Sequence, residues 1–122
     1  MSSIWVAIGA ISGFLSVAFG AFGAHALAKT LDPHALSIYH TGAQYQMYHA
    51  LALIGLGLWS AQHPGVSSAV PGWAFTAGTL LFSGSLYALA LSGLRILGAI
   101  TPLGGVLFLA GWVAFAFLAL KA

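Results

Sequence analysis

The sequence predicts an all-α integral membrane protein, a bundle of four transmembrane helices that forms one domain over residues 1–122. Hydrophobic residues make up 61% of the chain, charged residues make up 3%, and the mean hydropathy is +1.02. A water-facing surface normally carries roughly 25% charged residues, so this composition excludes an ordinary soluble domain. The 122 residues leave room for about four spans of ~20 residues with short connections.

The charged residues are too few and too scattered to indicate a charged partner. They are Lys29, Arg95 and Lys121 against the single acidic residue Asp32. Because no basic patch forms, nucleic acid is not an expected partner. The expected partners of such an apolar chain are membrane lipids. The chain has no cysteine, which excludes disulfides, thiolate chemistry and cysteine-bound metals.

The first predicted span covers residues 4–27, which carry no charge. A signal peptide is a poorer interpretation, because the start Met-Ser-Ser lacks a positive segment and the apolar run exceeds the usual ~7–15 residues. Small residues recur along this span at spacings of 4, 3, 4 and 3, which places them on one stripe of a helix. We expect this stripe to pack against another helix of the bundle, with a homodimer seam as the alternative. Its members are Gly9, Gly13, Ser16, Gly20 and Gly23.

The second predicted span, residues 38–60, belongs to a longer helix. Asp32 followed by Pro33 is a helix-start signal, because the carboxylate can cap free amides and proline suits the first helical position. A helix from there toward Ser60 is longer than the ~30 Å hydrocarbon core. We therefore expect an amphipathic extension in the interfacial layer before the span itself.

Two further spans follow the Pro- and Gly-containing segment 62–71. Residues 72–92 form the third span, and Thr101-Pro102 repeats the helix-start signal ahead of the fourth, residues 102–121. Gly105 and Gly111 are the predicted packing positions of that last helix. The connections after the first and third spans hold Lys29 and Arg95, against Lys121 on the other side, and this count favours termini outside.

A polar layer near one end of the bundle is the candidate functional site. Gln44 and Tyr48 are four residues apart, as are Tyr45 and His49, so each pair can touch on the helix surface. The end of the first span and the second half of the third reach the same side of the membrane. The predicted layer, a possible ligand-binding site, comprises His25, Gln44, Tyr45, Gln46, Tyr48, His49, Ser83, Ser85 and Tyr87.

Several functions compete for such a layer. A structural, assembly or lipid- or small-ligand-binding bundle is favoured, because an interhelical polar network needs no ligand to exist. The alternative is a homo-oligomeric transporter or channel that uses His25, His49 and hydroxyls as a polar pathway. The five histidines include no pair three or four residues apart, so neither a metal nor a cofactor is expected. The sequence contains no Gly-x-Ser-x-Gly elbow and no carboxylate near His25 or His49. An enzyme is therefore not expected.

Five ordered motif blocks resemble a small membrane family known as domain of unknown function 423. They are GAFGAHAL (20–27), YQMYHAL (45–51), LFSGSLY (81–87), TPLGG (101–105) and Gly111-Trp112. The resemblance implies a compact bundle of four transmembrane helices in bacterial inner membranes, with similar proteins in eukaryotes. It implies no activity, and leaves open a homo-oligomer or a membrane-complex partner. The motif positions it marks are His25, Gln46, His49, Ser83, Ser85, Tyr87, Pro102 and Gly105.

Overall fold

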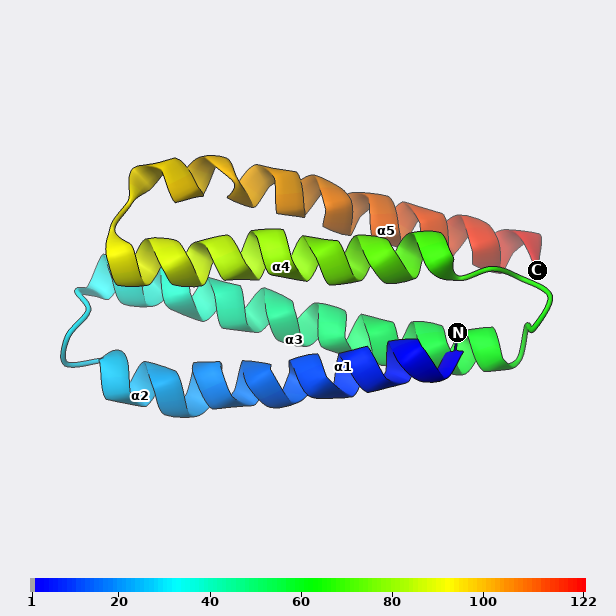
Figure 1. Ribbon diagram of the computed structural model, residues 1–122, viewed down its shortest axis with the longest axis horizontal. Helices are drawn as coiled ribbons and strands as arrows, with labels where there is room; N and C mark the ends of the chain where they lie inside the picture. Colours follow the sequence, from blue (N-terminus) through cyan, green and yellow to red (C-terminus); the bar gives the residue numbers. More distant parts are fainter. Residues whose placement is uncertain (1) are drawn as a thin grey trace.

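The computed structural model describes residues 2–122 as four long antiparallel helical rods (Figure 1). The first rod is α1 (Ser2–Val17), a π-helical turn η1 (Ala18–Gly23) and α2 (Ala24–Leu27). The others are α3 (Pro33–Ala61), α4 (Ala69–Ser92) and α5 (Thr101–Lys121), with a short 3-10 turn η2 (Arg95–Ala99) before α5. The all-α, four-helix prediction is confirmed.

The rods pack in the order α1, α3, α4, α5. α3 lies against both α1 and α4, and α5 packs against α4. The start of α1 and the end of α5 lie at the same end of the bundle (Figure 1). Four rods that each cross the membrane once would bring the two ends to the same side, which agrees with this arrangement.

Three helical segments in the described part of the chain are long and apolar enough to cross a membrane: Ser2–Leu27, Ala69–Ser92 and Arg95–Lys121. α3 is outside this set, and its first half holds the polar residues noted above. Its 29 residues nevertheless run alongside α1 and α4. A fourth span in α3 remains a prediction, which this packing favours.

The ends of the helices follow local chemistry. Asp32 caps α3, since its Oδ1 accepts a hydrogen bond of 2.7 Å from the Ala35 amide, and Pro33 opens the helix. α4 starts at Ala69, earlier than the predicted residue 72, so Pro71 lies in its first turn, where a missing amide hydrogen costs little. Gly93, with φ of +72°, ends α4 in the left-handed conformation that glycine tolerates.

The small-residue stripe of the first rod lies against α3, inside the bundle. A Cβ atom at Gly9 would lie 2.6 Å from the Ala50 carbonyl oxygen, and one at Gly20 would lie 3.1 Å from the Ala43 Cβ. Ser16 adds a hydrogen bond of 2.8 Å to the Ala43 carbonyl. This close packing occupies the stripe, so it is not free to form a homodimer seam.

α5 approaches α4 most closely at Gly104 rather than at the predicted Gly105. A Cβ at Gly104 would collide with the backbone of Phe82, whereas one at Gly105 would lie at an ordinary 3.9 Å from the Phe82 ring. Gly111 gives the second close approach, where a Cβ would lie 2.7 Å from the Phe75 ring. One face of α5 thus seats on two phenylalanines of α4.

Candidate functional site

Gln46 is the centre of a buried polar network that joins three helices. Its side chain is 5% exposed, and its Nε2 donates to the carbonyl oxygen and the Oγ of Ser12 at 3.2 and 3.3 Å. The Tyr87 hydroxyl donates to the Gln46 Oε1 at 2.6 Å. The network therefore links α1, α3 and α4 through one amide side chain.

Small and aromatic neighbours hold Tyr87 in this position. A Cβ at Gly42 would lie 2.9 Å from the Tyr87 ring, so only glycine gives the ring room. The Tyr39 ring packs 5.1 Å from the Tyr87 ring, and the Tyr39 hydroxyl donates to the Phe19 carbonyl at 2.8 Å. Phe19 lies in the π-helical turn, a local feature often found at functional sites.

A groove opens between α1 and α4 beside this network. Its cavity volume is about 220 Å³, and the residues that line it come from α1, α3 and α4. The hydroxyls of Thr76 and Thr79 are bonded to carbonyls of their own helix, at 2.8 and 2.9 Å. The lining residues are Ile8, Ile11, Ser12, Leu15, Gln46, Leu53, Thr76, Thr79 and Leu80.

Two contacts tie α1 to the rest of the bundle, one beyond the groove and one within its lining. Towards the chain termini, the buried Trp5 donates through Nε1 to the Ser68 Oγ at 2.9 Å. Within the lining, Ser12 is held by Gln46. Ile8 and Ile11 lie between these two points, where α1 carries only apolar side chains toward α4.

His49 belongs to a second buried cluster, which faces α5. Its Nδ1 lies 2.7 Å from the Tyr45 carbonyl oxygen, and its Nε2 lies 3.0 Å from the Trp112 Nε1. A carbonyl only accepts and an indole N–H only donates, so the neutral ring with the proton on Nδ1 satisfies both bonds. The ring stacks on Phe108 at 3.5 Å. Both ring nitrogens are thereby occupied.

Within residues 2–122, the remaining predicted residues make no side-chain hydrogen bond to either cluster. Ser85 bonds Thr101 at 2.6 Å, which ties α4 to the start of α5. Ser83 is 1% exposed, and its Oγ has no hydrogen-bond partner within residues 2–122. Gln44 and Tyr48 bond each other at 2.6 Å on the outer surface of α3, next to the Tyr45 ring.

The structure does not bring His25 into a layer with His49. The His25 side chain is exposed. Gly13 packs level with Ala50 at 3.8 Å, and the 12 residues from Gly13 to His25 correspond to about 18 Å along the helix. A single polar layer with both histidines is therefore corrected to two clusters around Gln46 and His49, with His25 at the end of the bundle.

Ser12, Thr101 and Trp112 are partners that the sequence analysis missed. Ser12 lies beside the small-residue stripe and supplies a backbone carbonyl, which no side-chain pattern reveals. Trp112 is one of the apolar residues of α5, and only its packing opposite His49 gives its N–H a role.

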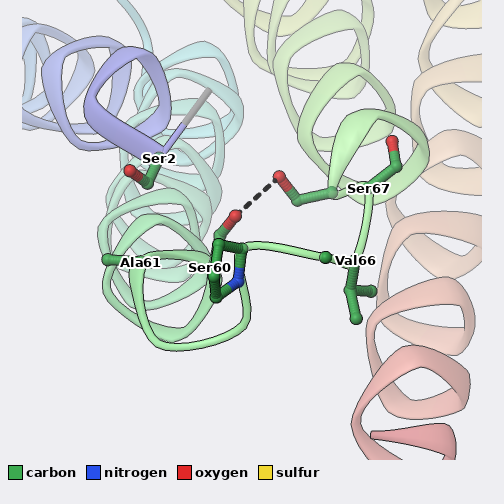
Figure 2. A pocket seen from close by; sticks show the side chains of 8 residues that line it. Ser2, Ser60, Ala61, Val66 and Ser67 are labelled. Carbon is green, nitrogen blue, oxygen red and sulfur yellow. Dashed lines mark hydrogen bonds between the residues drawn. The ribbon is translucent and has the colours of Figure 1, made fainter.

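A further cavity lies at the end of the bundle where α1 begins and α4 follows α3 (Figure 2). It has a volume of about 470 Å³ and is lined mainly by the loop between α3 and α4. Ser60 and Ser68 bond each other here at 3.2 Å, and Ser68 also accepts from Trp5. Within residues 2–122, no group of three or more His, Cys, Asp or Glu side chains could hold a metal ion.

Comparison with known proteins assigns the chain to a family. Residues 19–105 match the family described as protein of unknown function, DUF423. The chain belongs to the DUF423 family. The matched range of DUF423 includes Gln46, His49 and Tyr87, whereas Ser12 and Trp112 lie outside it.

Relatives of this DUF423 chain are bacterial membrane proteins. It is 44% identical to the UPF0382 membrane protein YwdK of Bacillus subtilis, over 97% of both chains. It is 48% identical to the UPF0382 inner membrane protein YgdD of Escherichia coli, over 84% of this chain and 79% of the relative. No solved structure matches this chain. These likenesses give a membrane location to the relatives and no biochemical activity.

Proposed function

We propose that this protein is a non-catalytic inner-membrane bundle that binds the apolar chain of a membrane lipid, or of a lipid-like molecule, in the groove between α1 and α4. The observation that carries the proposal is the mostly apolar groove of about 220 Å³ between α1 and α4. The inner-membrane location is carried over from the name of the relative YgdD.

The groove has the composition that an apolar chain requires. Ligand sites are concave and mostly apolar, with a few fixed polar groups. Ile8, Leu15 and Leu80 supply apolar surface, and Gln46 is anchored at the base by three hydrogen bonds. Because those bonds are internal, Gln46 can hold the groove in shape without a ligand.

Two other functions have less support. A polar pathway through His25 and His49 would need exchangeable protons or polar contacts in sequence, but both nitrogens of His49 are engaged and His25 lies about 18 Å away along the bundle. A catalytic role would need a nucleophile next to a base. Neither cluster places a hydroxyl or a carboxylate against a free histidine nitrogen.

Retention of lipid by the purified protein tests the proposal. Native mass spectrometry of protein released from micelles should show a bound lipid-sized mass. The double variant Ile11→Trp/Leu80→Trp narrows the groove from both walls, at positions 63% and 71% exposed, and should lower the bound fraction. Val113→Trp, on α5 and 70% exposed, is the matched control. Equal lipid retention by both variants would contradict the proposal.

A further inference from the structure

The outer face of α3 has the residue spacing of a coiled-coil seam. Ser37, Gln44, Leu51 and Leu58 recur every seven residues and are all exposed. Thr41, Tyr48 and Gly55 repeat with the same period between them, and Tyr48 and Gly55 are also exposed. Steps of four and three residues keep these positions on one side of the helix, which is the geometry through which two helices can pack along their length.

As the predicted fourth span, α3 places part of this face at the depth of the hydrocarbon. Tyr48 is 15 residues from Pro33 and 13 from Ala61, so it is about 22 and 20 Å from the ends of α3. Gln44 is 11 residues from Pro33, or about 16 Å, which is inside a ~30 Å core centred on the helix. Both side chains therefore face a region where lipid chains offer no hydrogen bond.

The pair of Gln44 and Tyr48 is only partly satisfied. The Gln44 Nε2 donates to the Tyr48 hydroxyl. An amide has two N–H donors and an accepting oxygen, and a phenol has its own O–H donor. Within residues 2–122, the Gln44 oxygen and the Tyr48 O–H have no partner. Such groups in hydrocarbon cost several kcal/mol each until they are paired.

We propose that the outer face of α3 packs against the same face of α3 in a second copy of this chain. Two copies in one membrane share their orientation, so a two-fold axis along the membrane normal makes the two α3 helices parallel. In a parallel pair each seam position faces itself, and Gln44 meets Gln44 of the other copy. The amide is self-complementary, since each oxygen can accept from the other nitrogen.

The surroundings leave room for this partner. A Cβ at Gly55 would meet nothing within 4 Å, so the helix backbone is open to close approach there. Shallow grooves flank the ridge, one of about 310 Å³ beside Gly20 and Ala21, and one of about 420 Å³ beside Gly105 and Leu109. Helices pack when the ridge of one enters the grooves beside another.

Cysteine cross-linking tests the face directly, because the chain has no native cysteine. Leu51→Cys, on the seam and 60% exposed, should form a disulfide product of twice the chain mass when membranes are oxidised. Val113→Cys, 70% exposed on α5, is the control and should give at least about tenfold less. Equal yields, or no product from Leu51→Cys, would overturn the proposal, as would a product whose mass includes another protein.

A pair of glycine variants provides a second measurement. Gly55→Leu and Gly84→Leu both add a side chain where a Cβ meets nothing within 4 Å, so neither should disturb the monomer. Energy transfer between labelled copies in vesicles should show that Gly55→Leu weakens association at least about tenfold, while Gly84→Leu leaves it unchanged. Unchanged association of Gly55→Leu would refute the seam. The lipid groove lies between α1 and α4, so either result is independent of lipid retention.

Discussion

Removing the Tyr87 hydroxyl should destabilise the bundle through Gln46. Tyr87→Phe leaves the Gln46 Oε1, in a side chain 5% exposed, without its 2.6 Å donor, and an unpaired buried group costs about 1–3 kcal/mol. Gln46→Leu removes the bonds to both Tyr87 and Ser12, and should cost about 2–3 kcal/mol. Interhelical hydrogen bonds in membranes couple by about 0.6 kcal/mol on average and about 1.7 at most. The loss of unfolding free energy in the double variant Tyr87→Phe/Gln46→Leu should be smaller than the sum of the two single losses by an amount in that range.

The measurement is a double-mutant cycle on the free energy of unfolding, with the detergent-solubilised protein titrated with a denaturing detergent and followed by circular dichroism. Ser92→Ala is the control, because the exposed Ser92 hydroxyl bonds only the Ala88 carbonyl at 2.6 Å and the Leu94 amide at 3.2 Å, both at the end of α4 and away from Gln46. Paired with Gln46→Leu it should be additive within about 0.3–0.5 kcal/mol. A coupling of zero between Gln46 and Tyr87 would refute the network as a link between helices.

Three further predictions use the same measurement. Gly104→Ala should lower the free energy of unfolding by about 1–3 kcal/mol, because the added Cβ clashes with the Phe82 backbone. Gly105→Ala, whose Cβ would lie 3.9 Å from the Phe82 ring, should raise it by up to about 1 kcal/mol through helix propensity. Equal effects of the two variants would contradict the close approach at Gly104. Trp112→Phe should lose about 1–3 kcal/mol, because the His49 Nε2 then lacks its donor. Ser83→Ala should not destabilise the protein, since the Ser83 hydroxyl has no partner within residues 2–122. Ser85→Ala should lower the free energy of unfolding by about 1 kcal/mol, because it removes the bond to Thr101. A larger loss for Ser83→Ala than for Ser85→Ala would contradict this prediction.

The fold could be predicted because each of its determinants is local in the sequence. The low content of charged residues predicts a membrane environment, and the lengths of the apolar segments predict the spans. Asp32-Pro33 and Thr101-Pro102 mark helix starts that the structure has at Pro33 and Thr101. The start of α4 was placed three residues late, at residue 72 rather than Ala69. A proline that usually ends a helix is equally suited to its first turn, and the sequence alone does not distinguish the two.

The site could be predicted in composition but not in pairing. The sequence indicates that Gln46, His49 and Tyr87 need partners, yet the donor to His49 is Trp112 and the acceptor in α1 is Ser12. Those partners depend on the register between antiparallel helices, which residue spacing within one helix does not determine. The sequence predicts one layer with His25 and His49 because the first span ends on the side from which the second helix starts, but the register separates the two histidines by about 18 Å.

The polar half of α3 has two sides, so its polar residues need hydrogen-bond partners in two different directions. Residues 44 and 46 are two apart and so point about 200° from each other around a helix. α1 and α4 cover the side of Gln46, where every polar atom of its amide finds a donor or acceptor from those helices. They cannot also cover the side of Gln44, whose amide reaches only Tyr48 of its own helix. We propose that this amide, which no described helix satisfies at the depth of the predicted span in α3, pairs with a polar group from outside the chain, and a second copy would bring the same amide to the same depth.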